Sequence, residues 1–205
     1  MKGAVGIGWA ATLLALGTLA AQSQQPVTDE APVLTETGQL DVGGHAVNYV
    51  IHRLPVSSFP DMPFWVTGEL ARRGCMIPQT WSAHRPENAV HGSFEQAGSN
   101  DWAVLCSAQG QVTLLVFFAS HPGTVQELAS QPEVERLQPW NVKGDLGFNW
   151  AIDPATPQRV HDAQSGMSRR PARPDHDALA DATVDRRTLY RFFTRGRWTL
   201  LDMPE

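Results

Sequence analysis

Residues 101–118 of the 205-residue chain read DWAVLCSAQGQVTLLVFF. Two apolar runs in this stretch, Trp102–Cys106 and Val112–Phe118, are separated by a short segment that contains Gly110. Both runs are strongly β-prone, and a short glycine-containing connection between two such runs is typical of a β-hairpin. The stretch therefore predicts two neighbouring antiparallel strands.

Other parts of the chain repeat this pattern. Near the C-terminus, Thr188–Phe193 and Arg197–Leu201 flank a turn at Thr194–Gly196. Further strand candidates are Ala46–Leu54 and Gly147–Ile152. Helical segments alternate with the strands irregularly, without the strand–helix–strand rhythm of a parallel sheet. We therefore expect an α+β fold, in which an antiparallel sheet built of hairpins is accompanied by two or three short helices.

Three segments are candidates for these helices. The first begins at the capping residue Asp61, has Pro63 in its first turn and ends before Gly74, a residue that favours helix ends. The second has Thr156 as its cap. The third is Thr124–Ser130, which is short and precedes a proline.

Composition and charge exclude several classes of protein. Charged residues make up 18% of the chain and hydrophobic residues 42%, which is too apolar for a disordered tail. The net charge of −5 argues against a dedicated nucleic-acid binder, because neutralising phosphates needs a cationic surface. The length fits one ordinary domain. We expect residues 41–205 to form this single α+β domain, and residues 22–40 to form a flexible N-terminal arm.

The N-terminus has the layout of a secretory signal peptide. Lys2 precedes the uncharged stretch Ala4–Ala21, and small and polar residues follow. We expect residues 1–21 to be removed on export, which places the domain in the periplasm or outside the cell. The alternative is an uncleaved membrane anchor, because the apolar stretch of about 18 residues is near the lower limit for a span. No later segment is a candidate for a span.

The chain contains two cysteines, Cys75 and Cys106. An even pair outside the cytoplasm is more often a disulfide than two free thiols, so we expect a bridge. Two buried free thiols are the first alternative. A catalytic thiol is the second, although the apolar strand around Cys106 suits a buried residue better than an exposed nucleophile.

Residues 90–105, VHGSFEQAGSNDWAVL, resemble the repeat core of FG-GAP/VCBS modules, the blade units of integrin-like β-propellers. In that family the loop between the Phe and the apolar strand binds calcium. The resemblance implies a type of hairpin, because a propeller needs four or more blades. The matching positions are Gly92, Phe94, Gly98, Asp101, Ala103 and Val104, and the family's ligand positions fall on Ser93, Glu95, Ala97 and Asp101.

A broader pattern is similar to uncharacterised exported bacterial proteins. It consists of GC-x-IPQ at residues 74–79, P-x-N-x-V-x-G-x-F at residues 86–94 and DWAVLCS at residues 101–107. This resemblance implies export and homology, and it brings no activity with it.

A second acidic segment has a spacing that is plausible for a calcium loop. Its carboxylates are Asp175, Asp177 and Asp181, and the glycine that usually allows the sharp turn of such a loop is replaced by Ala178. As an alternative, the first two aspartates cap a short helix. Calcium is the only cofactor that the sequence suggests.

An arginine-rich loop is the candidate site for an anion. Arg169, Arg170 and Arg173 lie close together in sequence, and guanidinium groups bind carboxylates and phosphates in bidentate geometry. Lipid head groups or anionic glycans are the ligands that this site would meet outside the cytoplasm. The alternative is a solvated face in which these arginines pair with nearby aspartates.

No catalytic motif is found: the sequence contains neither H-E-x-x-H nor G-x-S-x-G. We expect an exported, non-catalytic domain with a binding or structural role in the periplasm or cell envelope. Its expected partner is an envelope component or an anionic ligand. The alternative is an extracytoplasmic hydrolase, which would pair His176 or His84 with Asp101 or Asp181.

Overall fold

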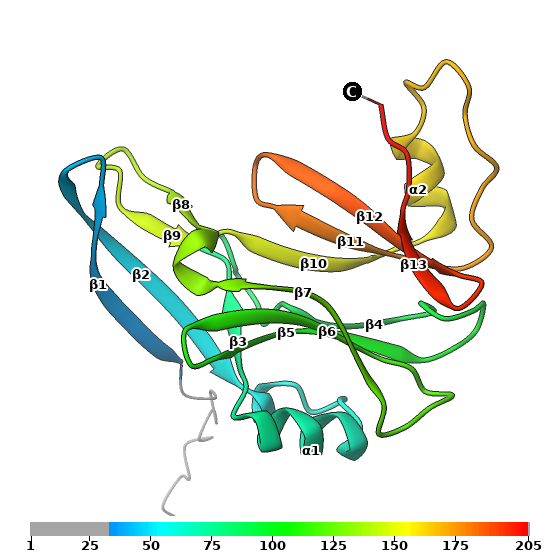
Figure 1. The fold of residues 1–205 in the computed structure, drawn as a ribbon, viewed down its shortest axis with the longest axis horizontal. Helices are drawn as coiled ribbons and strands as arrows, with labels where there is room; N and C mark the ends of the chain where they lie inside the picture. Colours follow the sequence, from blue (N-terminus) through cyan, green and yellow to red (C-terminus); the bar gives the residue numbers. More distant parts are fainter. Residues whose placement is uncertain (1–32, 205) are drawn as a thin grey trace, which may run out of the picture. The chain divides into compact units, whose positions relative to one another are not determined.

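The computed structural model of the protein describes residues 33–204. The predicted signal segment, 1–21, and residues 22–32 of the predicted arm lie outside the described residues. Residues 33–204 form an α+β fold with two α-helices, two 3₁₀-helices and thirteen strands in two sheets (Figure 1). The predicted fold class is confirmed. Within these residues no helix is long and apolar enough to cross a membrane.

The larger sheet has nine strands, and its pairs are antiparallel except for β2 with β9. The strand order is β7-β6-β5-β3-β2-β9-β8, with β1 paired to β2 and β4 paired to β5. The strands of this sheet are β1 (Leu34–Val42), β2 (His45–Pro55), β3 (Met76–Gln79), β4 (Ala89–Gly92), β5 (Asp101–Ala108), β6 (Gln111–Phe117), β7 (Val125–Pro132), β8 (Leu137–Pro139) and β9 (Leu146–Phe148).

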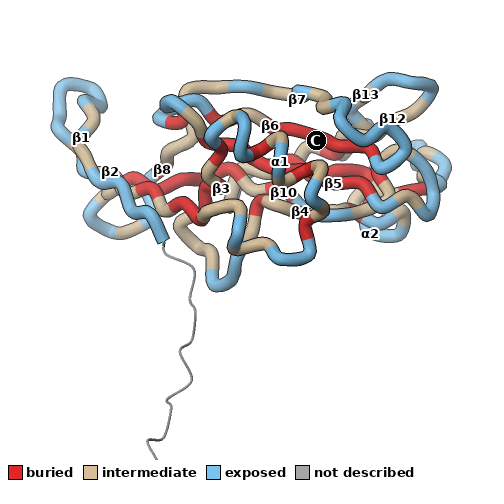
Figure 2. The backbone as a smooth tube through the Cα atoms, turned by 90° about the horizontal axis from the view of Figure 1, so that it is seen from below, coloured by how far each residue is buried: buried red, intermediate tan, exposed pale blue. Residues whose placement is uncertain are grey.

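The predicted central hairpin is β5–β6. Ala108 pairs with Gln111, so the turn consists of Gln109 and Gly110, which both have positive φ values (52° and 75°). Two positive φ values are the signature of the turn whose twist fits a tight hairpin. Almost every residue of the two strands is buried, and Figure 2 shows this hairpin in the buried centre of the domain.

The smaller sheet is wholly antiparallel, in the order β10-β11-β12-β13. One core joins the two sheets, because Leu105 and Phe148 of the larger sheet pack with Trp150 and Leu179 of the smaller one. The strands of the smaller sheet are β10 (Trp150–Ala155), β11 (Ala178–Thr183), β12 (Arg187–Thr194) and β13 (Arg197–Leu200).

The two α-helices occur close to where the sequence predicts them. Helix α1 (Phe64–Arg73) is capped by Pro63 and not by Asp61, and it ends at Gly74 with φ of 69°. Helix α2 (Pro157–Ala163) begins as predicted, because the Thr156 hydroxyl accepts the backbone N–H of Arg159. The 3₁₀-helices are η1 (Val56–Ser58) and η2 (Glu133–Arg136).

The third predicted helix, Thr124–Ser130, is wrong, because this segment belongs to strand β7. β7 pairs with β6 from Phe117–Val125 to Gln111–Pro132, with one register shift between Leu114 and Leu115. Without β7, one edge of the buried strand β6 would have unpaired backbone groups. Pairing that edge outweighs the weak local preference of a short segment for helix.

The predicted flexible arm also needs a correction. Residues 34–40 begin β1, which pairs with β2 from Leu34–Arg53 to Val42–His45. Most of β1 is exposed, so backbone pairing and not burial holds it in place. A polar strand of this kind lacks the apolar alternation that marks a strand in a sequence.

The predicted disulfide is present: Cys75 and Cys106 are bonded, with their Cα atoms 5.0 Å apart. Cys75 follows Gly74, the residue that ends α1, and Cys106 lies within β5. Both side chains belong to the second core of the domain, together with Val66 and Leu70 of α1. The bond therefore fastens the end of the helix to the central hairpin.

Candidate functional site

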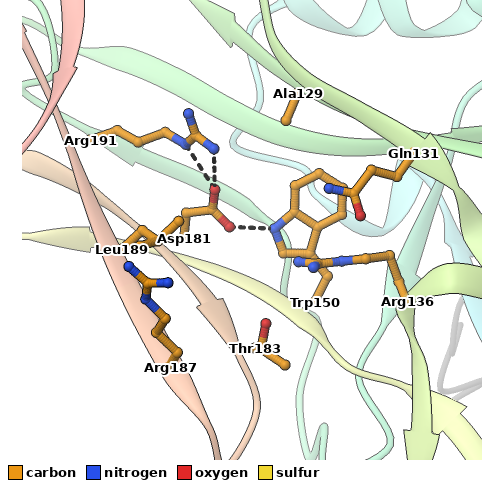
Figure 3. Close-up of a pocket in the computed structure, with 9 residues that line it drawn as sticks. All are labelled: Ala129, Gln131, Arg136, Trp150, Asp181, Thr183, Arg187, Leu189 and Arg191. Carbon is orange, nitrogen blue, oxygen red and sulfur yellow. Dashed lines mark hydrogen bonds and ion pairs between the residues drawn. The ribbon is translucent and has the colours of Figure 1, made fainter.

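A cavity of about 210 Å³ lies between β7 and η2 on one side and strands β10, β11 and β12 on the other (Figure 3). The elements on its two sides are distant in sequence, so the cavity exists only when the two sheets pack together. Its lining residues are Ala129, Gln131, Arg136, Trp150, Asp181, Thr183, Arg187, Leu189 and Arg191.

Strand register explains why one face of the smaller sheet supplies most of this lining. Trp150 lies opposite Thr183, and Thr183 lies opposite Arg187. In the same way Asp181 lies opposite Leu189. Residues paired across strands share a face, and every second residue of a strand returns to it. The opposite face, with Ala180 and Tyr190, packs against α2.

Asp181 is the buried acceptor at the centre of the site. Its Oδ1 accepts the indole N–H of Trp150 at 2.6 Å, and its Oδ2 accepts Nε and Nη2 of Arg191 at 2.8 and 2.7 Å. Figure 3 shows the carboxylate between these two side chains. Asp181 therefore fixes the orientation of both groups and balances the charge of Arg191.

Arg136 is the cation that lacks such a partner. Its guanidinium lies over the Trp150 ring, 4.2 Å from the ring centre, in a cation–π contact. Within residues 33–204 it forms no ion pair, and its buried Nε has no hydrogen-bond acceptor. Burial lowers the pKa of the Arg136 guanidinium, and the charge of Asp181 opposes this shift only in part.

Arg187 gives the cavity a third guanidinium, on the exposed side. The lining contains three arginines and one aspartate, so positive charges exceed negative charges by two. Gln131 and Thr183 add neutral hydrogen-bonding groups. A buried cation without a counter-charge is unfavourable. An anion in the cavity would supply the missing acceptor, and guanidinium groups suit carboxylate, phosphate and sulfate oxygens.

The structure does not assemble the predicted calcium loop. Asp175 contacts His176 (Oδ1 to Nδ1, 2.7 Å), and this hydrogen bond lowers the pKa of Asp175. Asp177 accepts the backbone N–H of Ser93 at 3.0 Å, and Asp181 is held by Trp150 and Arg191. The three carboxylates thus share no partner: Asp175 and Asp177 have one each, and Asp181 has two. In the described part of the chain, no group of three His, Cys, Asp or Glu side chains could hold a metal ion.

The predicted anion loop does not converge either. Arg170 donates through Nε to the backbone carbonyl of His161 at 2.9 Å and lies 3.6 Å from Asp162. Arg169 and Arg173 are exposed and line none of the described cavities. The three arginines of this loop therefore do not line a common cavity among those described.

The residues missed at this site have no shared local signal. Arg187 and Arg191 belong to the arginine-rich C-terminal region, but their side chains reach the cavity because of strand register in the smaller sheet. Arg136 lies in a 3₁₀-helix of an unrelated part of the chain. Only the packing of η2 against β10 brings its guanidinium onto Trp150.

The pairs named for a hydrolase are also separated. His176 is buried, and its ring nitrogens face Asp175 and the carbonyl of Phe193. His84 is exposed. Asp101 is fully buried and accepts two backbone N–H groups, that of Glu95 in the preceding loop and that of Ala119 after β6. The FG-GAP-like loop is thus closed by a carboxylate that accepts backbone N–H groups.

A different serine, histidine and carboxylate do meet, next to a cavity of about 460 Å³ lined by Glu95, Phe118, His121 and Phe193. The Ser120 hydroxyl donates to Glu95, and His121 Nδ1 lies 2.7 Å from Ser120 Oγ. A hydroxyl has one proton, so Nδ1 has to donate to Ser120. A histidine that donates in this way does not take the serine's proton. The contact therefore favours a structural role in holding the loop over an activated nucleophile.

Comparison with known proteins adds no further assignment. No family model matches the chain, and neither a curated protein nor a solved structure matches it.

Proposed function

We propose that this chain is an exported, non-catalytic ligand-binding domain of the periplasm or cell envelope, and that its ligand carries an anionic group. The group is a carboxylate, phosphate or sulfate held by Arg136, Arg187 and Arg191. One observation carries the proposal: a half-buried guanidinium that forms no ion pair within residues 33–204 faces a cavity that two further arginines line.

The energetics favour an occupied site. A buried charge is tolerated when it is paired and hydrogen-bonded, and it is costly when it is not. The cation–π contact with Trp150 stabilises the charge of Arg136 but leaves its buried Nε–H without an acceptor. An oxyanion would accept this N–H group while Asp181 continues to hold Trp150 and Arg191 in place.

Two observations support export. Residues 1–21 have the layout of a signal peptide, and the bonded pair Cys75–Cys106 is of the kind that persists in oxidising compartments.

Thermal melts test the binding proposal. The melting temperature Tm would be measured in sodium sulfate, phosphate, acetate and chloride at equal ionic strength, for the wild type and for R136Q. A ligand that binds only the folded state raises Tm. Sulfate also stabilises proteins through exclusion from their surface, so R169Q, which changes an exposed arginine, is the matched control.

We expect sulfate or phosphate to raise the Tm of the wild type and of R169Q more than that of R136Q. Equal shifts in all three proteins would contradict an anion site at Arg136.

A further inference from the structure

Trp140, in the loop after β8, is a large aromatic side chain that is 42% exposed. It packs beside Gly147 of β9, where a Cβ atom would lie 3.1 Å from Trp140 Cδ1 and 2.7 Å from Trp81 Cβ. The absence of a side chain at Gly147 lets both tryptophans approach the strand. Trp140 is therefore fixed along one edge while much of its ring remains open to a ligand.

Two cavities meet at Trp140. One, of about 370 Å³, is lined by Gln39, Asn48 and Asp145 among others. The other, of about 280 Å³, is lined by Trp81, Gln138, Asp185 and Arg186 together with Trp140.

The polar groups of the first cavity are already ordered. Gln39 Nε2 donates to Asn48 at 3.0 Å, and Asn141 Nδ2 donates to Asp145 at 2.9 Å. After these contacts, each of the amides and the carboxylate of Asp145 can still form further hydrogen bonds. The ring of Trp140 is thus bordered by hydrogen-bonding groups that are held in place before a ligand arrives.

An exposed aromatic ring bordered by ordered polar groups favours a ligand that has both an apolar face and polar groups. A purely apolar ligand on Trp140 would bury the neighbouring amide and carboxylate groups without partners, which is unfavourable. A purely polar ligand would make no use of the exposed aromatic face. A sugar ring has a face of C–H groups and a rim of hydroxyls that donate and accept, so it satisfies both parts of the surface.

The surface around Trp140 and the cavity lined by Arg136, Arg187 and Arg191, called the anion cavity below, are lined by neighbouring residues of the same segments. Arg186 lines the cavity at Trp140, and the next residue, Arg187, lines the anion cavity. On the opposite wall, Arg136 lines the anion cavity and Gln138 lines the cavity at Trp140. Gln138 Nε2 also donates to the carbonyl of Val184 at 3.0 Å, which fastens the β11–β12 turn to β8.

From this juxtaposition we infer that the anionic group is carried on a saccharide, so that the ligand is an acidic oligosaccharide. Its charged group binds at Arg136 and Arg187, and a neighbouring sugar ring stacks on Trp140. The inference rests on the proposed function, because it places the anion of that proposal in the arginine-lined cavity.

The test is calorimetric titration of the purified protein with three probes: a tetrasaccharide of galacturonic acid, a neutral tetrasaccharide of galactose, and sodium sulfate. The variants are W140A and R136Q. Their matched controls are F64A, which removes an aromatic ring that is 88% exposed at the start of α1, and R169Q.

We expect the acidic tetrasaccharide to bind more tightly than either the neutral one or sulfate. W140A and R136Q should each weaken its binding about tenfold, the size of effect that loss of a dominant aromatic or arginine contact produces. F64A and R169Q should leave it unchanged. W140A should leave sulfate binding unchanged, because Trp140 does not line the anion cavity.

The two proposals fail in different ways. If sulfate binds in an Arg136-dependent manner but W140A leaves the binding of the acidic tetrasaccharide unchanged, the saccharide inference is wrong and the anion site stands. If the neutral tetrasaccharide binds as tightly as the acidic one, the inference is also wrong. If R136Q changes the binding of no probe, the anion site itself is wrong.

Discussion

Arg53 in β2 and Glu133 in η2 form an ion pair inside the domain, with Nη2 of the arginine 2.5 Å from Oε2 of the glutamate. Burial alone would lower the pKa of Arg53, but its hydrogen bonds to Glu133 and Glu36 and the charges of these two residues raise it. Because η2 ends at Arg136, this pair also holds the segment that supplies the half-buried cation of the anion cavity.

The first prediction concerns this pair. E133A leaves Arg53 buried with only the more exposed Glu36 as a carboxylate partner, so we expect it to lower the free energy of unfolding by about 3 kcal/mol. Urea denaturation measures the change. E135A removes an exposed carboxylate from the same 3₁₀-helix and should change stability little. Equal losses in the two variants would mean that the ion pair does not stabilise η2.

The disulfide gives the second prediction. Titration of free thiols in denatured, unreduced protein should give a value near zero, whereas a value near two would contradict the bond. The double variant C75S/C106S should lose about 3–4 kcal/mol of stability, because the bond closes a loop of 31 residues. The loss should appear in urea denaturation without reductant, and it should shrink when the wild type is reduced.

The third prediction is a pH dependence. Hydrogen bonds from Arg72 and Arg73 lower the pKa of Glu69 from 4.5 to about 2. A carboxyl group with a lowered pKa in the folded state contributes stability above its unfolded pKa and loses it as the pH falls through its folded pKa. The wild type should therefore be more stable than E69Q above pH 4.5, and this advantage should disappear between pH 4.5 and 2.

Denaturant unfolding at several pH values measures this difference. E135Q serves as the control, because Glu135 is an exposed carboxylate without an ion pair within residues 33–204. A constant difference between the wild type and E69Q over the whole range would mean that the arginines of α1 do not hold Glu69 ionised.

The fourth prediction tests the charge of the anion cavity. D181N removes the negative charge and keeps a side-chain oxygen that can accept the indole N–H of Trp150. Removing a unit charge about 4 Å away changes the free energy of anion binding by about 1 kcal/mol even at the dielectric constant of water. We therefore expect sulfate to bind D181N about fivefold more tightly, in calorimetric titration.

The same variant should be less stable than the wild type without sulfate, because Arg191 loses its ionic partner. D185N, which changes an exposed aspartate in the β11–β12 turn outside the anion cavity, is the control. Weaker sulfate binding by a folded D181N would show that Asp181 acts mainly by positioning Arg191 and Trp150.

The fifth prediction concerns the central hairpin. Gln109 has φ of 52°, a conformation that is unfavourable for most side chains and tolerated by asparagine. Q109N creates the Asn-Gly pair that this type of turn prefers, so we expect a stability gain of about 0.5 kcal/mol in urea denaturation. G110A should destabilise, because Gly110 has φ of 75°. A loss of stability in Q109N would indicate a role for the glutamine side chain.

Local patterns predicted the parts of the fold that depend on neighbouring residues. The apolar runs around Gly110 predicted β5 and β6, and Gly74 and Thr156 marked helix ends that the structure contains. The pair Cys75–Cys106 was predicted from number and compartment. Each of these features depends on a residue type that imposes a conformation or a covalent bond.

Features that depend on distant partners were missed. β7 is a strand because β6 has an edge to pair, and β1 is a strand because β2 lies beside it. The anion cavity has the same origin, since Arg136 and Arg191 line it together only because the two sheets pack against each other. Sequence patterns report local preference and burial, and they carry little information about which distant surfaces meet.

The stability that the bond between Cys75 and Cys106 adds depends on the cellular compartment, because the bond forms only where thiols are oxidised. A chain that cellular thiols keep reduced lacks the covalent link between the end of α1 and β5. Its unfolded state is less restricted, so it opens more readily and is easier to thread through a narrow channel. If the domain is exported, as we propose, oxidation outside the cytoplasm forms the bond, and the domain becomes most stable in the compartment where its proposed ligand would be.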